Sequence, residues 1–370
     1  MLSSNPAPTI TAAELAALLG TSRQPLLVDV RTEAEHREWS IPGSVNIPLD
    51  ALHKHLDALP RDTPFVVHCA SGIRSRQAVE ALRGAGRPAL DLAGGMKAWA
   101  RVYDTAEIAA GPVTIVQVRR RGKGCLSYLV GAGGEAFAVD PSTDTARYIE
   151  IARRYGWRIS RVFDTHLHAD HLSGARALAI ATGATLHLNP ADTFDFGYTP
   201  IADGDMFPLG HHERAFGVAA LSAPGHTEGS TLFLVGEDAV LSGDTLFIDG
   251  VGRPDLAERA EAFARQLHRS LHERVLTLPD HAVVLPAHYS DAVAVRPDEP
   301  VAATLGALRR TLAPLAFEED RFIAWAATQV IPRPPNHVDI VLANMGRPRL
   351  APHELPALEA GPNRCAVSAA

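Results

Sequence analysis

The sequence predicts an α/β protein of two domains, in which a small doubly wound parallel sheet is followed by a larger αββα sandwich. Three observations lead to this expectation. The chain has 370 residues, about the length of two typical domains, and its 46% hydrophobic and 21% charged residues are ordinary for a globular protein. Strand-like and helix-like stretches alternate over the first hundred residues. Beyond them, strands follow one another across glycine-rich turns with helices only at intervals.

The first domain is expected to begin with a short amphipathic helix, because residues 11–14 form a capping box ahead of several leucines. Buried parallel strands are expected at 26–31, 64–68 and 89–92, with a helix at 75–83, since apolar runs that end in charge are typical of such strands. The carboxyl ends of these strands form the sheet edge where ligands bind in this fold class.

A cysteine stands at that edge. Cys69 ends a strand and is followed by Gly72, Arg74 and a helix, so backbone N–H groups and the positive end of the helix surround its sulfur. Such surroundings lower a thiol pKa and bind anions, and the arginine offers a planar fork for sulfonate or phosphate oxygens.

The segment His68–Ser75 resembles the active loop of rhodanese sulfurtransferases. Other stretches similar to that family's signatures are 29–31, 41–44 and 95–99. The resemblance extends over residues 8–105 and departs from the family at Trp39 and Ser40, where Gly-His is usual.

The resemblance implies that Cys69 is catalytic and carries sulfane sulfur as a persulfide. Thiosulfate or another sulfur substrate would bind the loop residues Ala70, Ser71, Gly72, Ile73, Arg74 and Ser75. Two other interpretations stay open. Cysteine-dependent phosphatases also pair a Cys with an Arg, but with five residues between them, whereas four residues separate Cys69 from Arg74. Alternatively, Cys69 is a core thiol in an inactive rhodanese-like module.

The domain boundary is expected between Arg101 and Gly111, where periodicity weakens, so the domains should span 1–105 and 112–370. The second domain is expected to contain strands at 113–118, 126–130, 136–140, 158–163, 185–188, 231–235 and 239–242. Its helices are expected at 145–155, 172–182 and 258–272. Hairpins of strands interrupted by helices suit an αββα sandwich.

Four potential metal ligands lie within six residues directly after one of these strands, namely His166, His168, Asp170 and His171. Two imidazoles at alternate positions of an extended loop project to the same side. Three more ligand-type residues stand beside small or turn-forming residues, which let a loop approach a metal closely. They are His226, Asp244 and His288. The chain is therefore expected to be a metalloenzyme.

These seven residues resemble the ligand set of the metallo-β-lactamase superfamily. The residues alone leave two kinds of chemistry open. All seven could hold two zinc ions, bridged by Asp244, for ester or thioester hydrolysis as in glyoxalase II. Alternatively, His166, His226 and Asp244 form a two-His, one-carboxylate set that suits Fe(II) and leaves positions for dioxygen and a sulfur ligand.

Further stretches resemble the persulfide dioxygenase branch of that superfamily, namely 165–171, 242–246, 250–255 and 334–345. This implies one Fe(II) per chain at His166, His226 and Asp244, with zinc instead if the hydrolase alternative holds. The implied reaction is the oxidation of a small thiol persulfide by O2 to sulfite and free thiol. Glutathione persulfide is the first candidate for the substrate. The remaining ligand-type residues would orient ligands or form a second metal position, and they are His168, Asp170, His171 and His288. Fusion to a module that handles persulfides favours this reaction.

Several residues near these motifs receive specific expectations. Arg253 should bind a substrate carboxylate, with an ion pair to Asp255 as the alternative. Tyr289 stands where this branch often has Asp, which bears on substrate identity. Cys125 is expected to be a buried apolar residue, and Cys365 to have no role. Histidines expected at the surface are His211, His212, His268, His272, His281, His337 and His353.

Charge and cysteine usage limit the partners. The net charge of −7, with no basic run longer than 119–121, argues against nucleic acid. No apolar run approaches the ~18 residues of a membrane span. Residues 1–8 show no secretory signal, and three distant cysteines suit a reducing compartment, so a cytoplasmic protein is expected. The oligomeric state stays open, a homo-oligomer included. A third interpretation is a non-enzymatic sulfur carrier or persulfide sensor.

Overall fold

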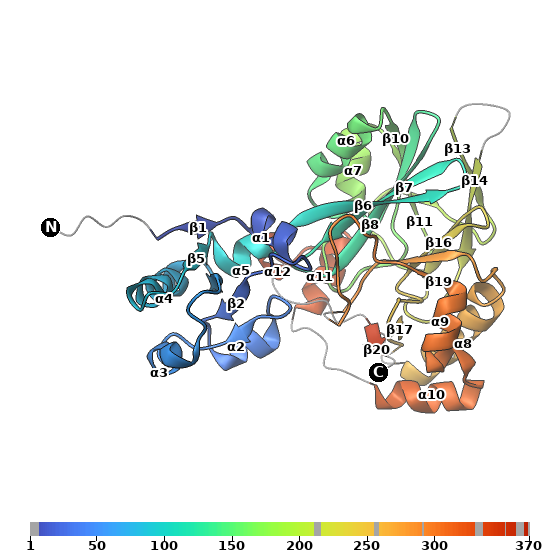
Figure 1. Cartoon of the computed structure of the whole chain (residues 1–370). Helices are drawn as coiled ribbons and strands as arrows, with labels where there is room; N and C mark the ends of the chain where they lie inside the picture. Colours follow the sequence, from blue (N-terminus) through green and yellow to red (C-terminus); the bar gives the residue numbers. More distant parts are fainter. Residues whose placement is uncertain are drawn as a thin grey trace.

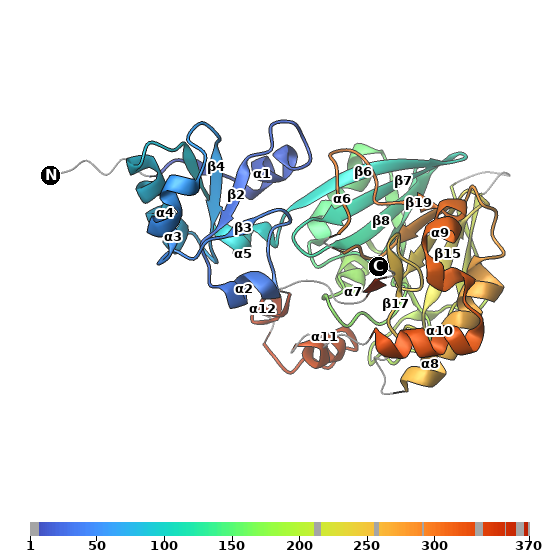
Figure 2. The ribbon, with the colours of Figure 1, turned by 60° about the horizontal axis from the view of Figure 1, so that its bottom comes forward.

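The computed structural model describes residues 7–210, 216–254, 259–290, 292–329, 336–351, 353–359 and 366–368. A small N-terminal domain lies beside a larger one built on two sheets (Figures 1 and 2). Within the described residues, no helix is both long enough and apolar enough to cross a membrane.

The N-terminal domain is built on a parallel sheet in the order β1-β5-β4-β2-β3. Its strands are β1 (Thr9–Ile10), β2 (Leu26–Asp29), β3 (Val45–Asn46), β4 (Phe65–His68) and β5 (Ala89–Leu92). Its helices are α1 (Ala12–Leu18), α2 (Glu33–Glu38), α3 (Leu52–His55), the 3₁₀ turn η1 (Leu56–Ala58), α4 (Ile73–Gly84) and α5 (Gly95–Trp99). The central strand β4 gives Val66 to one core cluster and Phe65 and Val67 to another, as a strand covered on both faces should.

The larger domain contains a seven-stranded mixed sheet in the order β12-β11-β10-β9-β8-β7-β6. Its strands are β6 (Tyr103–Ala110), β7 (Val113–Arg120), β8 (Cys125–Ala132), β9 (Glu135–Val139), β10 (Arg158–Phe163), β11 (Thr185–Leu188) and β12 (Thr199–Pro200). A six-stranded sheet has the order β13-β14-β15-β16-β18-β19. Its strands are β13 (Met206–Leu209), β14 (Phe216–Ser222), β15 (Thr231–Val235), β16 (Ala239–Gly243), β18 (Val283–Pro286) and β19 (Ala303–Thr304). A separate pair joins β17 (Gly250–Gly252) to β20 (Ala366–Ser368).

Helices cover the outer face of each sheet, so the domain has αββα layers (Figure 1). The seven-stranded sheet packs on α6 (Thr145–Arg154) and α7 (Ala175–Thr182). The six-stranded sheet packs on α8 (Ala260–Ser270), the π-helical turn η2 (Leu271–Val275), α9 (Leu305–Thr311), the 3₁₀ turn η3 (Ala313–Ala316) and α10 (Glu319–Thr328). Two further helices are α11 (His337–Asn344) and α12 (Leu355–Leu358).

The core between the two sheets fixes the end of β10, from which the metal-ligand loop begins. Phe163, the last residue of β10, is fully buried and lies 4.9 Å, between ring centroids, from Phe233 of the opposite sheet. Burying such a side chain contributes about 1.5–3 kcal/mol. The loop after β10 therefore starts from a rigid point between the two sheets.

Residues 103–110 form strand β6 rather than the expected boundary segment between Arg101 and Gly111. Strand β6 pairs antiparallel with β7 along its whole length. It lies at the edge of its sheet, and exposed residues such as Glu107 break up the apolar pattern that would have revealed it. The chain thus passes from α5 almost directly into the second domain.

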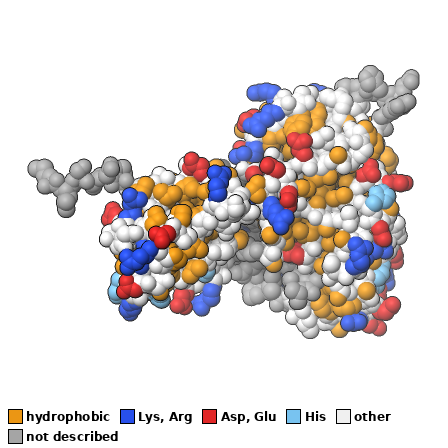
Figure 3. Space-filling view, viewed as in Figure 1, with side chains coloured by type: hydrophobic (Ala, Val, Ile, Leu, Met, Phe, Trp, Pro, Cys, Tyr) orange, Lys and Arg blue, Asp and Glu red, His pale blue; other side chains and the backbone are white. Residues whose placement is uncertain are grey.

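The two domains are joined by backbone and side-chain contacts at the start of the larger sheet. Trp39 Nε1 donates to the Gly122 carbonyl at 3.0 Å, and Arg120 Nε donates to the Ala100 carbonyl at 2.9 Å. A Cβ on Gly122 would lie 2.3 Å from the Trp99 carbonyl oxygen, so glycine allows this close approach. On the face drawn in Figure 3, Lys and Arg side chains are interspersed with Asp, Glu and apolar side chains.

Candidate metal centre and cysteine loop

The loop after β10 carries four of the predicted ligands, and its backbone is held by two buried carboxylates. Thr165 donates from N and Oγ1 to Asp140 at 2.6 and 2.9 Å. Leu167 N donates to Asp192 at 2.8 Å, and Asp192 also accepts from Gly229 N at 3.0 Å. The first ligand loop is therefore tied to the turn that carries His226.

The structure brings together in one group His166, His226 and Asp244, the three residues that the sequence analysis assigns to iron. Their candidate ligand atoms all lie within 4.8 Å of one another. Asp244 Oδ2 lies 3.5 Å from His166 Nε2 and 3.4 Å from His226 Nε2. The three residues follow β10, β14 and β16, so both sheets contribute to the group.

The unpaired atoms of this group fit a metal ion. His166 Nε2, His226 Nε2 and Asp244 Oδ2 are buried and make no hydrogen bond within the described part of the chain. The other polar atom of each side chain makes a hydrogen bond. His166 Nδ1 bonds Thr165 Oγ1 at 2.9 Å, His226 Nδ1 bonds the Arg253 carbonyl at 3.1 Å, and Asp244 Oδ1 bonds His288 Nδ1 at 2.7 Å. Because a carbonyl only accepts, His226 donates from Nδ1 and keeps a lone pair on Nε2. Burial, with the charge of His166, lowers the pKa of His226 to about 4, so this imidazole is neutral at pH 7.

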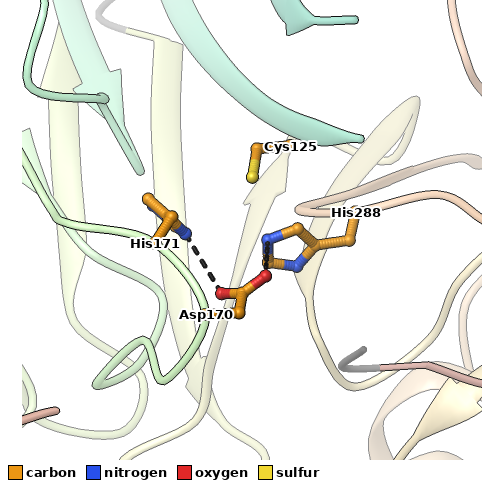
Figure 4. A group of neighbouring side chains, drawn as sticks. All are labelled: Cys125, Asp170, His171 and His288. Carbon is orange, nitrogen blue, oxygen red and sulfur yellow. Dashed lines mark hydrogen bonds and ion pairs between the residues drawn. The ribbon is translucent and has the colours of Figure 1, made fainter. Parts of the chain in front are cut away.

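A second group places Cys125 beside three predicted ligands. The candidate ligand atoms of Cys125, Asp170, His171 and His288 lie within 4.8 Å of one another, and the four side chains face a common space (Figure 4). The sequence interpretation of Cys125 as a buried apolar residue is therefore incomplete. The thiol is buried, but among polar groups.

His168 lies between the two groups, with its ring centroid 4.2 Å from that of His166 and 4.1 Å from that of His171, but its Nε2 is directed at other carboxylates. Its Nε2 lies 3.1 Å from Asp140 Oδ1 and 3.9 Å from Asp164 Oδ1, and these three form a third buried group. Because Asp140 also holds Thr165, His168 is in a position to stabilise the loop.

Arg253 is buried, and its carbonyl accepts from His226. A Cβ on the preceding Gly252 would lie 2.0 Å from the Asp244 carbonyl oxygen, so β17 approaches the Asp244 turn closely. Arg253 thus reaches the centre through its backbone. Asp255, its expected alternative partner, lies outside the described residues.

In the N-terminal domain, Cys69 follows β4 and is almost fully buried. Gly72, with φ of 97°, turns the chain into α4 and donates its N–H to Cys69 Sγ at 3.1 Å. Ser75 Oγ lies 3.3 Å from Sγ and 2.6 Å from Asp91 Oδ1. The N–H of Gly72 and the hydroxyl of Ser75 thus lie next to the sulfur, and the sequence analysis anticipated the N–H groups but not the hydroxyl.

The rest of the cysteine loop faces outward. Ser71 is exposed, Ile73 is 65% exposed, and Ala70 is half-buried. Arg74 donates two hydrogen bonds to Glu35, at 2.8 and 2.7 Å. The Glu35 carboxylate therefore occupies the guanidinium group that the sequence analysis assigns to a substrate anion.

The remaining histidines divide by location. His281 and His353 are exposed as predicted. His268 and His272 are half-buried instead, with ring centroids 4.1 Å apart, and His268 contacts the Phe317 carbonyl. His337 is half-buried, and the remaining two, His211 and His212, lie outside the described residues.

Comparison with known proteins gives the same division of the chain. Residues 11–102 match the family model of the rhodanese-like domain, and residues 120–288 match that of the metallo-beta-lactamase superfamily. Persulfide dioxygenase ETHE1, mitochondrial, of Bos taurus is 30% identical over 185 residues, which are 49% of this chain and 70% of that protein. The chain belongs to the metallo-beta-lactamase superfamily. Its N-terminal part is a rhodanese domain.

Other superfamily members are also similar. Hydroxyacylglutathione hydrolase of Anaeromyxobacter dehalogenans is 37% identical over 187 residues, which are 49% of this chain and 69% of that protein. The crystal structure of ETHE1 from Myxococcus xanthus superposes with a TM-score of 0.55 at 27% identity, covering 62% of this chain and 97% of that one. The predicted fold class, a rhodanese domain followed by an αββα metallo-β-lactamase domain, is confirmed, and the family implies a metal.

Sequence reasoning gave no role to Asn344, although the stretch around it resembles the dioxygenase branch. This residue ends α11, and its Nδ2 donates to the carbonyl oxygens of His168 and His171, both at 2.9 Å. Its Oδ1 accepts from Ser173 N at 2.9 Å. One side chain therefore holds the metallo-β-lactamase ligand loop at three backbone positions.

Asn344→Ala is expected to weaken metal binding by ~10–100-fold, the usual cost of losing a residue that orients ligands. The reason is that three backbone groups of the loop lose their partner. Competitive titration against a chromophoric chelator measures this. The matched control is Asn46→Ala, because Asn46 Nδ2 also donates to two carbonyls at 2.9 Å, but in the rhodanese domain. Equal metal affinity in both variants would contradict the role of Asn344.

Proposed function

We propose that the metallo-β-lactamase domain oxidises a small thiol persulfide, with glutathione persulfide as the first candidate, to sulfite and free thiol. The observation that carries this proposal is the group of His166, His226 and Asp244, whose three candidate ligand atoms lie within 4.8 Å of one another and make no hydrogen bond to any described residue. Two imidazoles and one carboxylate are the donor set of non-haem Fe(II) oxygenases. The similarity to proteins named persulfide dioxygenase supports the same activity.

The reaction balances with one O2 and one water for each persulfide. RSSH, O2 and H2O give RSH, sulfite and two protons, so the terminal sulfur is oxidised and both atoms of O2 are reduced. When bound, Fe(II) would supply open coordination positions and the electrons that make O2 reactive. A ferrous ion bound by the imidazoles of His166 and His226 and by the Asp244 carboxylate would keep a net positive charge, which would favour an anionic persulfide. The buried surroundings limit access of bulk water to the sulfur.

The rhodanese domain would exchange sulfane sulfur through Cys69. The thiolate attacks the outer sulfur of thiosulfate, the sulfur–sulfur bond breaks, and sulfite leaves with the bonding electron pair. The resulting persulfide anion would be stabilised by the N–H of Gly72 and the hydroxyl of Ser75. Transfer of that sulfur to a small thiol gives the substrate of the other domain, so fusion raises the local concentration of a reactive intermediate.

Glu35→Gln is expected to lower the KM for thiosulfate by up to ~5-fold. The reason is that the partly exposed ion pair between Glu35 and Arg74, which thiosulfate must displace, contributes ~0.2–1 kcal/mol. Glutamine preserves the capping box that Glu35 forms with Thr32 at the start of α2. Steady-state kinetics of sulfur transfer measure the effect. The matched control is Glu38→Gln, an exposed residue of the same helix. A higher KM in the first variant would indicate that Glu35 orients Arg74 for binding.

A second candidate function is zinc-dependent thioester hydrolysis of the glyoxalase II type. It is favoured by the 37% identity to a hydroxyacylglutathione hydrolase and by the second group of ligand-type residues. Six of the seven ligands expected for a binuclear centre lie in the two groups, and the seventh, His168, lies next to His166 and His171.

The two candidates are separated by loading the purified full-length chain with Fe(II) or Zn(II) and offering two substrates. The proposal expects O2 uptake with glutathione persulfide in the iron form, one sulfite for each O2, and little thioester cleavage in either form. Rapid hydrolysis of lactoylglutathione by the zinc form, without O2 uptake by the iron form, would support the hydrolase instead.

A further inference from the structure

Asp91 is a buried carboxylate that lies beside the Cys69 loop and has no part in the reaction proposed above. It stands on β5 opposite Val67 of β4, the strand that ends just before Cys69, and is 2% exposed. Within the described residues it forms no ion pair, and Arg76 of α4 is the charged side chain that acts on it. A buried carboxylate without a paired cation depends on hydrogen bonds for its stability.

The hydroxyl of Ser75 lies between this carboxylate and the Cys69 sulfur. Its Oγ is 2.6 Å from Asp91 Oδ1 and 3.3 Å from Cys69 Sγ. A hydroxyl has one proton to donate, so it cannot donate fully to both acceptors. The shorter distance is in the range of ~2.5–2.7 Å that is typical of a hydroxyl bonded to an ionised carboxylate, whereas thiol sulfur is a weak acceptor. Ser75 therefore donates mainly to Asp91 while Cys69 is a thiol.

Both acceptors are fixed by the parallel sheet, so the hydroxyl proton is the part that moves. The backbone N–H of Asp91 donates to the Pro8 carbonyl at 2.9 Å, and β5 pairs with both β1 and β4. Ser75 is fully buried in the first turn of α4. To stabilise a thiolate on Cys69, the Ser75 proton has to turn from Asp91 to the sulfur, which leaves the carboxylate with a weaker set of hydrogen bonds.

We propose that Asp91 is a positioning residue of the sulfur-transfer site, which competes with Cys69 for the Ser75 proton and so weakens the stabilisation of the thiolate. The N–H of Gly72, 3.1 Å from the sulfur, has no such competitor. The functional meaning of this competition rests on the proposed role of Cys69. The competition itself follows from one hydroxyl and two acceptors.

The charged groups around the pair act in opposite directions. Burial raises the pKa of Asp91, and the hydrogen bond from Ser75 and the charge of Arg76 oppose that rise. On the other side of the sulfur, Arg74 interacts favourably with an ionised Cys69, but its guanidinium is bonded to Glu35. Asp91 acts against the thiolate in two ways, as a like charge and through the proton of Ser75. A test has to separate these two effects.

The competition affects the two halves of sulfur transfer differently. In the second half, an acceptor thiolate attacks the outer sulfur of the Cys69 persulfide, the sulfur–sulfur bond breaks, and Cys69 leaves as a thiolate with the electron pair. A less stabilised thiolate is a better nucleophile but a poorer leaving group. Asp91 would therefore favour loading of Cys69 with sulfur over its release.

Alkylation by iodoacetamide measures the Cys69 thiolate directly, because the thiolate is the reactive form. The full-length chain is treated over a range of pH, and mass spectrometry follows the peptide that carries Cys69. Asp91→Asn is expected to speed alkylation at pH 6 by ~10-fold, the change in thiolate fraction for about one pKa unit. The matched control is Glu80→Gln, which removes an exposed charge from the helix of Ser75 and should leave the rate unchanged.

A double variant separates competition for the proton from charge repulsion. In a Ser75→Ala chain no hydroxyl is shared, so adding Asp91→Asn should change the alkylation rate by less than ~2-fold. An equal effect of Asp91→Asn with and without Ser75 overturns the proposal, and so does an unchanged or slower rate in the single variant. Thermal unfolding shows which variants are folded, and Asp91→Ser takes the place of an unfolded Asp91→Asn. Alkylation needs no sulfur substrate, so its result does not depend on whether the chain transfers sulfur.

Discussion

His226→Ala is expected to reduce O2 uptake with glutathione persulfide by at least ~100-fold. Losing a residue that only hydrogen-bonds to a metal ligand lowers activity by ~10–100-fold, and losing a ligand itself should lower it more. His226 donates its Nδ1 proton to a fixed carbonyl and directs a neutral Nε2 at Asp244. Alanine removes one of three donors and leaves the Asp244 charge opposite a cavity. Iron content and O2 consumption should fall together.

The control for this variant is His281→Ala, because His281 is exposed and lies in the same domain. It should retain iron and activity. Thermal unfolding of both variants tests whether the fold is intact. A folded His226→Ala protein that binds one iron and consumes O2 at the normal rate would rule out the His166, His226 and Asp244 centre.

The positions of the candidate metal ligands could be found in the sequence because each follows a strand end beside a small residue. Strand β10 was predicted with its observed bounds, and the ligand loop begins directly after it. Strands β14 and β16 both run antiparallel to β15, which lies between them, and β18 runs parallel to β16, so the residues that follow these three strands lie at one edge of the sheet. The prediction that His166, His226 and Asp244 come together depends on this general geometry.

Side chains that meet only through the tertiary fold were not predictable in the same way. Cys125 lies in an apolar strand, and nothing local indicates that β8 pairs with the segment carrying His288. Asn344 approaches the ligand loop from 173 residues away in the chain. His168 alternates with His166 in sequence but turns to Asp140, because that buried carboxylate offers a closer partner. Sequence spacing reveals which residues can bind metal, but packing decides how they are grouped.

Cys69→Ser is expected to abolish sulfur transfer from thiosulfate, by at least ~1,000-fold, because a serine hydroxyl cannot replace the thiolate nucleophile. O2 uptake with preformed glutathione persulfide should stay unchanged, since the metal centre lies in the other domain. Cys365→Ser is the matched control for removing a thiol. A parallel loss of both activities in Cys69→Ser would mean that sulfur reaches the metal centre only through Cys69.

The pH dependence of the same reaction tests why Cys69 is reactive. Burial favours the neutral thiol, but hydrogen bonds from the Ser75 hydroxyl and from the N–H groups of Ser75, Ser71 and Gly72 outweigh it and lower the pKa of Cys69. Because the thiolate is the nucleophile, the transfer rate should rise with pH and level off below the ~8.5 of a free cysteine. Ser75→Ala removes the hydroxyl donor, so its midpoint should move to higher pH. If the midpoint instead stays where it is in the unmodified chain, the backbone N–H groups alone stabilise the thiolate, and Ser75 serves to hold Asp91.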